Sequence, residues 1–438
     1  MSKPSNASQP LAVQPVYLAA KAINSVIHML PAGTAYFIGV VLITMFTGHL
    51  VHHQGSLARA ALPYVVQLRW GWHRVERAMV RGKVSLDALF DRAVAWGIAS
   101  LPVEPVRLGK ERRTVHAIDS STVVRLRATK QRCALLGKGY CQRAQRAVQA
   151  NLVAALTSVV LIRGIRVGLV RRTRFGATCQ EAVAKVFADL PASPERRLLC
   201  VDAGIATIEQ FQAATAHDAL LGRLRKNVTL RRPPAPKPPG KRGRPTLHGP
   251  VLHPGAKRPE GRPDEDMTVR LEDREVRVRR WCNLPFRETP RTPIDVVRVD
   301  DPAYKRPLLI GTTARELTTD EIRSAYAHRW PIETNFYVAQ GTCAMEKPRA
   351  WSETGVARRI SLALLAGALL KAIAAACDPL PMGPWDVKAV ASAGRLANHL
   401  ALQTTNFVPL ALHGVTPRTY RKIPNPQKTM ELQFPLAA

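Results

Sequence analysis

The sequence predicts an α/β protein in which a helical N-terminal region precedes a core of alternating strands and helices. From about Val16 to Ser100 the apolar residues recur with the period of an α-helix. Further along, short runs rich in β-branched residues are bounded by turn residues, beginning with Thr114–Ile118. The chain has 438 residues and is 46% hydrophobic. A chain of this size and composition buries a sizeable core and divides into roughly two to four domains.

The first part of the core is predicted as three strands, a helix, a strand, a helix and a strand. The first strand, Thr114–Ile118, ends at Asp119, and the short buried strand Leu198–Val201 ends at Asp202. This order of elements is the one found in ribonuclease-H-like domains. The remaining strands are Ser158–Ile162, Ile165–Val170 and Leu220–Leu224, and the helices are Cys179–Leu190 and Thr207–Ala214.

A Pro-, Gly- and Lys/Arg-rich segment from Arg231 to Asp266 separates this part from the next strands. It has too few apolar residues to fold alone, so we predict a linker or a flexible arm. Its basic residues either lie along DNA or are simply solvated. The strands after it predict a small antiparallel sheet with one packed and one basic face. The basic residues are Lys237, Lys241, Arg242 and Arg244, and the strands are Thr268–Leu271, Glu275–Arg280, Ile294–Val299 and Pro307–Thr312.

The charge balance of the chain points to a polyanionic partner. Lys and Arg number 64 against 32 Asp and Glu, which gives a net charge of +32. Basic groups that neutralise phosphates release condensed counterions, so nucleic acid is the first candidate, ahead of an acidic membrane surface. In the helical N-terminal region, Arg77, Arg81 and Lys83 belong either to a DNA-end reader or to solvated helix faces.

The cysteines and the apolar stretches indicate the cellular compartment in which the protein is expected. The seven cysteines are scattered without a C-x-x-C pair, so we predict neither a disulfide framework nor a zinc ribbon, and a cytoplasmic location suits them. Ala35–Phe46 is shorter than the ~20 residues that a membrane span needs. Val356–Cys377 is interrupted by three basic residues. Both are therefore predicted as buried helices, and a membrane protein is the weak alternative.

Asp119 and Asp202 share a sequence context. Each follows a short hydrophobic strand and precedes small or hydroxyl residues, in AIDSST and CVDAGIAT. Carboxylates at strand ends project from the edge of a sheet, where oxygen ligands hold a divalent ion. An aspartate after a strand is more often a turn or a helix cap, so each position taken alone keeps that interpretation open.

A third acidic residue lies in the more specific motif YAHRWPIETNF. Tyr326, Arg329 and Glu333 stand at i, i+3 and i+7, which places them along one face of a helix. A capping box at Thr318 begins that helix. Pro331 interrupts it, so we expect Glu333 in the first turn of a second helical segment.

With these residues the chain resembles the DDE transposases of bacterial insertion sequences, within the retroviral-integrase-like superfamily. The subgroup concerned has a Tyr-Arg-Glu-Lys signature around the third acid and a β insertion before it. Two residues separate Tyr326 from Arg329 and three separate Arg329 from Glu333, which matches the signature. The resemblance extends from about Val115 to Cys377.

The signature lysine is missing. Its position, six residues after the glutamate, is Gln340, and this departure puts the phosphate contact of that lysine in doubt. Lys347 and Arg349 are the candidates to replace it in binding DNA.

The resemblance implies a ribonuclease-H-like catalytic domain with an inserted antiparallel β subdomain and an N-terminal helical domain. Together with the polar composition of 1–15 and the helical pattern and basic charge of 16–105, we expect a disordered segment at 1–15, a helical DNA-binding domain at 16–105 and the first part of the core at 110–230. A basic linker and the inserted subdomain follow at 231–312, then the last part of the core at 313–378 and a C-terminal region at 379–438.

The resemblance also implies a DNA transposase that cleaves transposon ends and transfers strands into target DNA. Three carboxylates at one point repel one another unless cations neutralise them, and hard oxygen ligands select Mg²⁺ or Mn²⁺. Asp119, Asp202 and Glu333 are thus expected to bind two such ions. Arg329 is expected on a phosphate and Tyr326 on the DNA backbone.

Further expectations concern partners and location. A homodimer bound to DNA is expected because two DNA ends must be paired. The expected location is the bacterial cytoplasm, near the nucleoid. Trp281 is either a stacking platform for an unpaired base or, more commonly for tryptophan, a core residue. The rival hypotheses are a ribonuclease-H-like nuclease that does not join strands and a catalytically decayed DNA-binding derivative, for which Gln340 is the best support.

Overall fold

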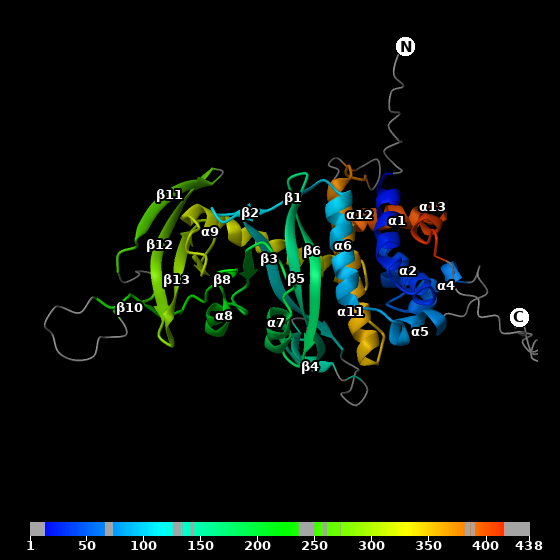
Figure 1. Ribbon diagram of the computed structural model, residues 1–438, viewed down its shortest axis with the longest axis horizontal. Coiled ribbons are helices and arrows are strands. Elements are labelled where there is room, and N and C mark those ends of the chain that lie inside the picture. Colours follow the sequence, from blue (N-terminus) through cyan, green and yellow to red (C-terminus); the bar gives the residue numbers. More distant parts are fainter. Residues whose placement is uncertain are drawn as a thin grey trace, which may run out of the picture.

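The structure, a computed structural model, describes residues 14–415 except for 66–72, 126–132, 134, 142–143, 236–248, 257–260, 272, 382–385 and 387–389. Within these residues the protein is mixed α/β, with one large mixed sheet and a group of helices at one end (Figure 1). The predicted α/β class is confirmed. The predictions for the first 13 residues and for Lys237, Lys241, Arg242 and Arg244 lie outside the described residues.

The centre of the sheet carries the strands of the two aspartates: β7 ends directly before Asp202, as predicted, whereas β3 continues past Asp119 to Val124 and does not end there. The strands run in the order β6-β5-β3-β7-β8, where β3 is parallel to β7 and β7 to β8, while β5 is antiparallel to both β3 and β6. A tight turn at Arg163 and Gly164, both with positive φ, joins β5 to β6, as is usual for a two-residue hairpin. The bounds are β3 Arg113–Val124, β5 Arg146–Ile162, β6 Ile165–Gly176, β7 Arg197–Val201 and β8 Asp218–Arg223.

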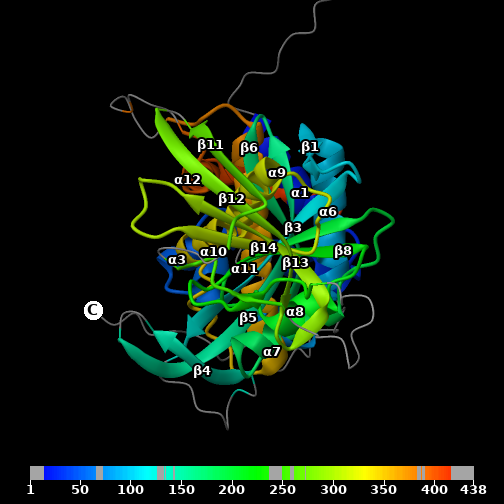
Figure 2. The same ribbon diagram turned by 90° about the vertical axis from the view of Figure 1, so that its left-hand side faces the viewer.

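The strands inserted before Glu333 extend this same sheet, whereas we predicted a small sheet of their own. Strand β14 pairs antiparallel with β8, and β13, β12 and β11 follow it outward. Pairing to β8 satisfies the backbone groups that an edge strand leaves open, so a separate sheet does not form. Figure 2 views the molecule from this end. The bounds are β11 Glu265–Leu271, β12 Arg274–Phe286, β13 Thr289–Asp300 and β14 Leu308–Thr312.

The face of these strands that we predicted as basic is charge-balanced. Val276 and Val278 of β12 are buried as expected. The intervening arginines, however, form ion pairs with aspartates on the neighbouring strands, Arg277 with Asp266 at 2.6 Å and Arg279 with Asp300 at 2.6 Å. Opposite charges on neighbouring strands stabilise the pairing, so these arginines are not free for DNA.

Helices cover both faces of the central strands. α7 (Cys179–Ala188) begins at the N-cap Thr178 and packs on β3, β5 and β6. α8 (Ile208–Ala213) joins β7 to β8. The predicted capping box at Thr318 is present at the start of α9 (Thr319–Tyr326). The 3₁₀ turn η2 (Ala327–Arg329) then separates α9 from α10 (Trp330–Gly341), whose first turn contains Pro331, as predicted.

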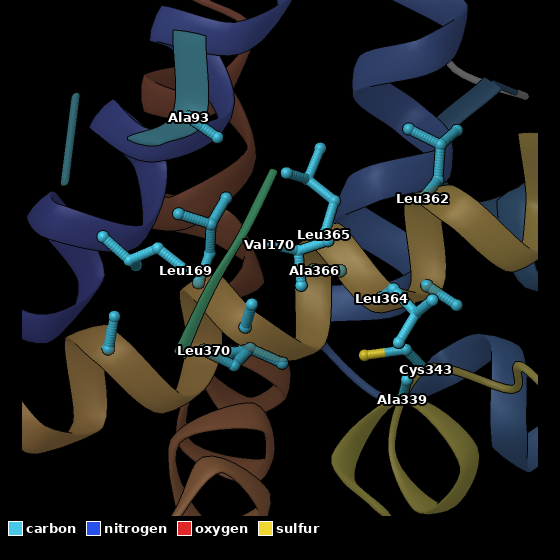
Figure 3. Packing of buried hydrophobic residues seen from close by; sticks show 14 of the residues in the cluster. Ala93, Leu169, Val170, Ala339, Cys343, Leu362, Leu364, Leu365, Ala366 and Leu370 are labelled. Carbon is cyan, nitrogen blue, oxygen red and sulfur yellow. The ribbon is translucent and has the colours of Figure 1, made fainter. Parts of the chain in front are cut away.

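The helix α11 (Glu353–Ala376) is the centre of the larger core. Its Leu365, Ala366 and Leu370 lie beside Leu169 and Val170 of β6 (Figure 3). Each leucine buried this way contributes about 1.5–3 kcal/mol. On its other sides α11 contacts α1, α2, α5, α6 and α12, and so joins the sheet to the N-terminal helices. These are α1 Gln14–Ile27, α2 Ala32–Phe46, α3 His49–His52, α4 Leu57–Val65, α5 His73–Arg81 and α6 Leu86–Ser100, with α12 Ala393–Leu402 and α13 Thr404–Ala411 beside them.

Both apolar stretches considered as membrane spans are buried helices. Every residue of α2 from Ala35 to Phe46 is buried, as predicted. In the described part of the chain one helix, α11, is long and apolar enough to cross a membrane by length and composition, and 89% of its most apolar window is buried inside the protein. The core helix of a globular protein passes the same test.

The short strands complete the element order. β1 (Val103–Pro105) and β4 (Leu136–Cys141) pair with β5, and β2 (Arg107–Leu108) pairs with β3. β9 (Leu230–Arg231) and β10 (Val251–Leu252) form a separate two-stranded sheet.

Candidate active site

Asp119 and Asp202 lie side by side because their strands are parallel neighbours. In the register of β3 and β7, Ile118 is opposite Val201, so the next residue of each chain segment is an aspartate. Neighbouring strands run about 4.8 Å apart, which places the two side chains at the same edge of the central sheet. Sequence order alone does not give this register.

The carboxyl group of Asp119 is mostly buried. It accepts a hydrogen bond from the backbone N–H of Ser120 at 2.7 Å, and 18% of its side chain is exposed. Burial raises the pKa of Asp119 to about 6, and the nearby carboxylates of Glu333 and Asp202 add to the rise. The Ser120 N–H and Arg329 oppose it without cancelling it. A carboxyl group with a raised pKa beside other carboxylates is typical of a functional site.

Glu333 reaches this edge from the first turn of α10. The helix is fixed to the sheet by Asn335, whose buried side-chain amide donates to the carbonyl of Gly168 on β6 at 2.9 Å. The side chain of Glu333 is 34% exposed and forms a hydrogen-bonded ion pair with Arg329 of the preceding 3₁₀ turn. The close approach of α10 to β6 depends on the absence of a side chain at Gly168.

Arg329 joins the third acid to the first. The same terminal nitrogen, Nη1, that pairs with Glu333 lies 3.7 Å from Oδ2 of Asp119. The guanidinium side chain is only 9% exposed. Burial lowers the pKa of Arg329, but the hydrogen bond and charge of Glu333 outweigh burial and leave the pKa raised. Arg329 is therefore the cation that lies between the two carboxylates and offsets part of their negative charge in this structure.

Tyr326 completes the group on the side of Asp202. Its hydroxyl donates to Oδ1 of Asp202 at 3.2 Å, and the guanidinium carbon of Arg329 lies 5.4 Å from the centre of its ring. Burial raises the pKa of Tyr326 to about 12, so the phenol keeps its proton at neutral pH and acts as a donor. Five of the eight site residues predicted from the sequence thus meet: Asp119, Asp202, Tyr326, Arg329 and Glu333.

Gln340, at the position of the signature lysine, faces the same strand as Glu333. Its amide nitrogen donates to the hydroxyl of Ser121 on β3 at 3.2 Å. Glu333, Tyr337 and Gln340 are spaced as i, i+4 and i+7 on α10 and share one face. Tyr337 is 77% exposed, so this face opens to solvent.

A preformed metal cluster is not present. Among the described residues, no group of three or more His, Cys, Asp or Glu side chains is arranged to hold a metal ion. The contacts explain this, because Glu333 turns to Arg329 and Asp202 accepts from Tyr326. The donor set is nevertheless entirely oxygen, which fits a hard cation such as Mg²⁺ once Arg329 releases Glu333.

Three other DNA-binding candidates lie apart from this group. Trp281 is fully buried in the core formed with α7, α8 and their strands, so it cannot stack on a base and its interpretation as a core residue is the correct one. Lys347 lies after α10 and its ammonium group donates to the side chain of Gln54 at 2.6 Å. Arg349 is exposed in the same loop. No described contact brings Lys347 or Arg349 to the carboxylates.

The sequence analysis overlooked a basic group beside the site. Arg223 ends β8, and Arg225 and Lys226 follow it, all three exposed. Because β7 and β8 are parallel, this group lies at the same edge of the sheet as Asp202. None of the three forms an ion pair with another described residue. The signal was available, since Arg223 lies near the end of the predicted strand Leu220–Leu224 and Arg225 and Lys226 directly follow it.

Comparison with known proteins adds no relative. No protein-family model matches the chain, and no curated protein matches it in sequence. The geometry of the site therefore carries the functional argument.

Proposed function

We propose that the protein is a DNA transposase that cleaves DNA at the ends of a mobile element and joins them to target DNA. The observation that carries the proposal is the meeting of Asp119, Asp202 and Glu333 through Arg329 and Tyr326. These residues come from three distant parts of the chain, and the spacing of the last motif matches the signature of DDE transposases.

The topology supports a ribonuclease-H-like core. An antiparallel unit of β6, β5 and β3 is followed by the parallel strands β7 and β8. In the sequence α7 lies between β6 and β7, and α8 lies between β7 and β8. The first acid lies on the central strand, the second directly after its parallel neighbour, and the third on a later helix that packs against β3, β5 and β6. The strands inserted between β8 and α9 agree with the β insertion of the same subgroup.

In this proposal Asp119, Asp202 and Glu333 hold two Mg²⁺ or Mn²⁺ ions. Bound divalent ions supply an activated water for cutting a strand and stabilise the departing 3′-oxygen. The raised pKa of Asp119 belongs to a carboxylate whose neighbours are also acidic, and a divalent cation removes that repulsion. The released 3′-hydroxyl would then attack the phosphorus of a phosphodiester in the target strand: a new bond forms between the donor 3′-oxygen and that phosphorus, the bond from the phosphorus to the target's own 3′-oxygen breaks, and the target strand leaves with a free 3′-hydroxyl.

The remaining residues of the group bind and orient DNA. Arg329 leaves Glu333 for a phosphate, which exchanges one charge-assisted contact for another of the same kind. Tyr326 keeps its proton and donates to a backbone oxygen. Arg223, Arg225 and Lys226 extend the positive edge beyond Asp202 and neutralise further phosphates.

One observation favours a second function, a decayed derivative that binds DNA without cutting it. Gln340 is neutral where the signature has a cation, and it is engaged with Ser121. Against this derivative, all three acids and both flanking motif residues are retained.

A strand-joining assay separates the candidates. The donor is labelled linear DNA ending in the sequences that flank the reading frame of this chain, and the full-length protein is supplied with Mg²⁺ and a target plasmid. We expect cleaved and joined products from the wild type and from Glu346→Gln, an exposed acidic residue just beyond α10. We expect neither product from Asp202→Asn. Cleavage without joining identifies the nuclease, and DNA binding without cleavage identifies the decayed derivative.

A further inference from the structure

A second polar cluster occupies a cavity away from the carboxylates. The cavity has a volume of about 400 Å³ and lies where β3 and β7 begin, next to the end of α6 and the loop before β7. His116 of β3 lines it. Since successive side chains of a strand point to opposite faces, His116 and Asp119, three residues apart, face opposite sides of the sheet. None of the five residues of the candidate active site lines the cavity, which is therefore separate from that site.

Its polar groups form one directed chain of hydrogen bonds. Nε of Arg171 lies 3.0 Å from the hydroxyl of Ser158, and an arginine nitrogen can only donate. The hydroxyl is also 3.2 Å from Nδ1 of His116. It donates to that nitrogen because the ring hydrogen lies on Nε2, whose neighbour, the Thr114 hydroxyl, gives its only proton to the carbonyl of Arg196 and can therefore only accept. The other ring nitrogen, Nε2, is 3.4 Å from the hydroxyl of Thr114. His116 and Ser158 are each less than one-tenth exposed.

The charge of Arg171 is incompletely balanced. Its closest carboxylate, Asp91 of α6, lies 3.6 Å away and pairs more closely with Arg172, at 2.9 Å. The other arginines of the cavity have carboxylates of their own, Arg107 with Glu195 at 2.8 Å and Arg197 with Asp218 at 2.6 Å. Arg171 is therefore the group most able to accept an additional anion.

The rest of the cavity wall is largely apolar. It is formed in part by Val106, Val115, Val159, Val160, Pro191 and Pro194. A cavity of a few hundred Å³ with apolar walls and a small number of convergent polar groups is the usual form of a small-molecule site. The wall excludes a hydrated inorganic ion as the best occupant, because such an ion leaves the apolar surface in contact with water.

We propose that this cavity binds a small organic anion, in which a carboxylate or phosphate group meets Arg171 and Ser158 and an apolar body fills the space between the valines and prolines. Arg171 supplies a charge-assisted hydrogen bond, and the Ser158 hydroxyl turns from His116 to donate to the same anionic group. The neutral ring of His116 adds no competing charge, since burial lowers its pKa to about 3, with the charges of Arg171 and Arg197 adding to the effect.

The test is a titration of the full-length protein by calorimetry with three probes. Benzoate and phenyl phosphate carry the anionic group on a ring, and benzyl alcohol carries a neutral hydroxyl on the same ring. We expect saturable binding of one benzoate or one phenyl phosphate per chain, and none of benzyl alcohol in the same concentration range. No saturable binding of either anion, or equal binding of the alcohol, overturns the proposal.

Variants locate the site. Arg171→Gln and Ser158→Ala should each weaken benzoate binding by about tenfold or more, because each removes a direct hydrogen bond to the anion. Arg166→Gln, an exposed arginine on the same strand, should bind as the wild type does. If Arg171→Gln does not fold, Ser158→Ala and the shift of the His116 ring resonances on saturation with benzoate decide the question. Unchanged affinity in Ser158→Ala with unshifted His116 resonances, or displacement of benzoate by duplex DNA, contradicts the proposal.

Discussion

Replacing Arg329 by glutamine should destabilise the protein in a way that a divalent metal reverses. The guanidinium is 9% exposed and touches two carboxylates, Glu333 at 34% and Asp119 at 18% exposure. Removing one partner of a fully buried pair costs about 3–5 kcal/mol, whereas an exposed pair contributes about 0–1 kcal/mol. This group lies between those limits, so we expect the free energy of unfolding to fall by about 2 kcal/mol.

The assay is denaturant unfolding with and without Mg²⁺. The variant leaves Asp119 and Glu333 free to bind the cation, and Mg²⁺ at ten times its dissociation constant restores about 1.4 kcal/mol. The matched control is Arg323→Gln, which breaks the more exposed pair with Asp320 on α9 and should cost under about 1 kcal/mol without a response to Mg²⁺. The reasoning is refuted if Arg329→Gln unfolds like the wild type, or if Mg²⁺ stabilises it no more than it stabilises the control.

Three further predictions concern the supporting residues. A methyl group at Gly168 would lie 2.4 and 2.8 Å from side chains of β5 and α10, so Gly168→Ala should displace α10 and lower DNA cleavage. The control is Gly341→Ala, whose methyl group meets nothing within 4 Å and should leave cleavage unchanged. His116 has a folded-state pKa of about 3 against 6.5, so it should contribute a loss of about 1.4 kcal/mol of unfolding free energy per pH unit as the pH falls from 6.5 towards 3. In urea unfolding at a series of pH values, His116→Gln should lose less stability than the wild type by this amount, while the loss due to His328, whose pKa burial lowers to about 4, remains. Gln340→Lys adds a cation to the open face of α10. Filter binding should therefore show tighter DNA binding, and the slope of log affinity against log salt concentration should steepen by about one. An unchanged slope would place that face away from DNA.

The sequence was sufficient to predict the elements that carry the site. A strand is present at each aspartate and ends directly before Asp202, but β3 continues past Asp119 to Val124, beyond the predicted end. Pro331 stands in the first turn of the helix with Glu333, as predicted. These predictions succeeded because proline, capping residues and short apolar runs act locally. The register that brings Ile118 opposite Val201 is a tertiary property, and no local signal specifies it.

Strand β5 was underpredicted for a related reason. Its 17 residues include a continuous buried run from Leu152 to Val159. Only the last part of the strand, Ser158–Ile162, was predicted. A strand covered on both faces has no alternation of apolar and polar residues, so its pattern does not distinguish it from a buried helix.

The buried arginines were the least predictable feature. Charged side chains are expected at the surface, and the large excess of basic residues reinforced the expectation that they face DNA. Yet Arg280 and Asp295 are paired in the core at 2.5 Å, and Arg329 lies among the carboxylates that we expected to bind metal. The pairing of Arg280 with Asp295 and the approach of Arg329 to Asp119 become visible only in three dimensions, whereas Glu333 stands four residues after Arg329 on the same helix face. Part of the positive charge therefore stabilises the fold rather than binding a polyanion.

The most direct test of the central claim is the position of Mn²⁺ in crystals of the protein bound to DNA, located by anomalous scattering. We expect two peaks about 4 Å apart between Asp119, Asp202 and Glu333, with Arg329 turned from Glu333 to a phosphate. Saturating Mn²⁺ that leaves these carboxylates without a peak, while Arg329 remains paired with Glu333 in the DNA complex, would contradict the account.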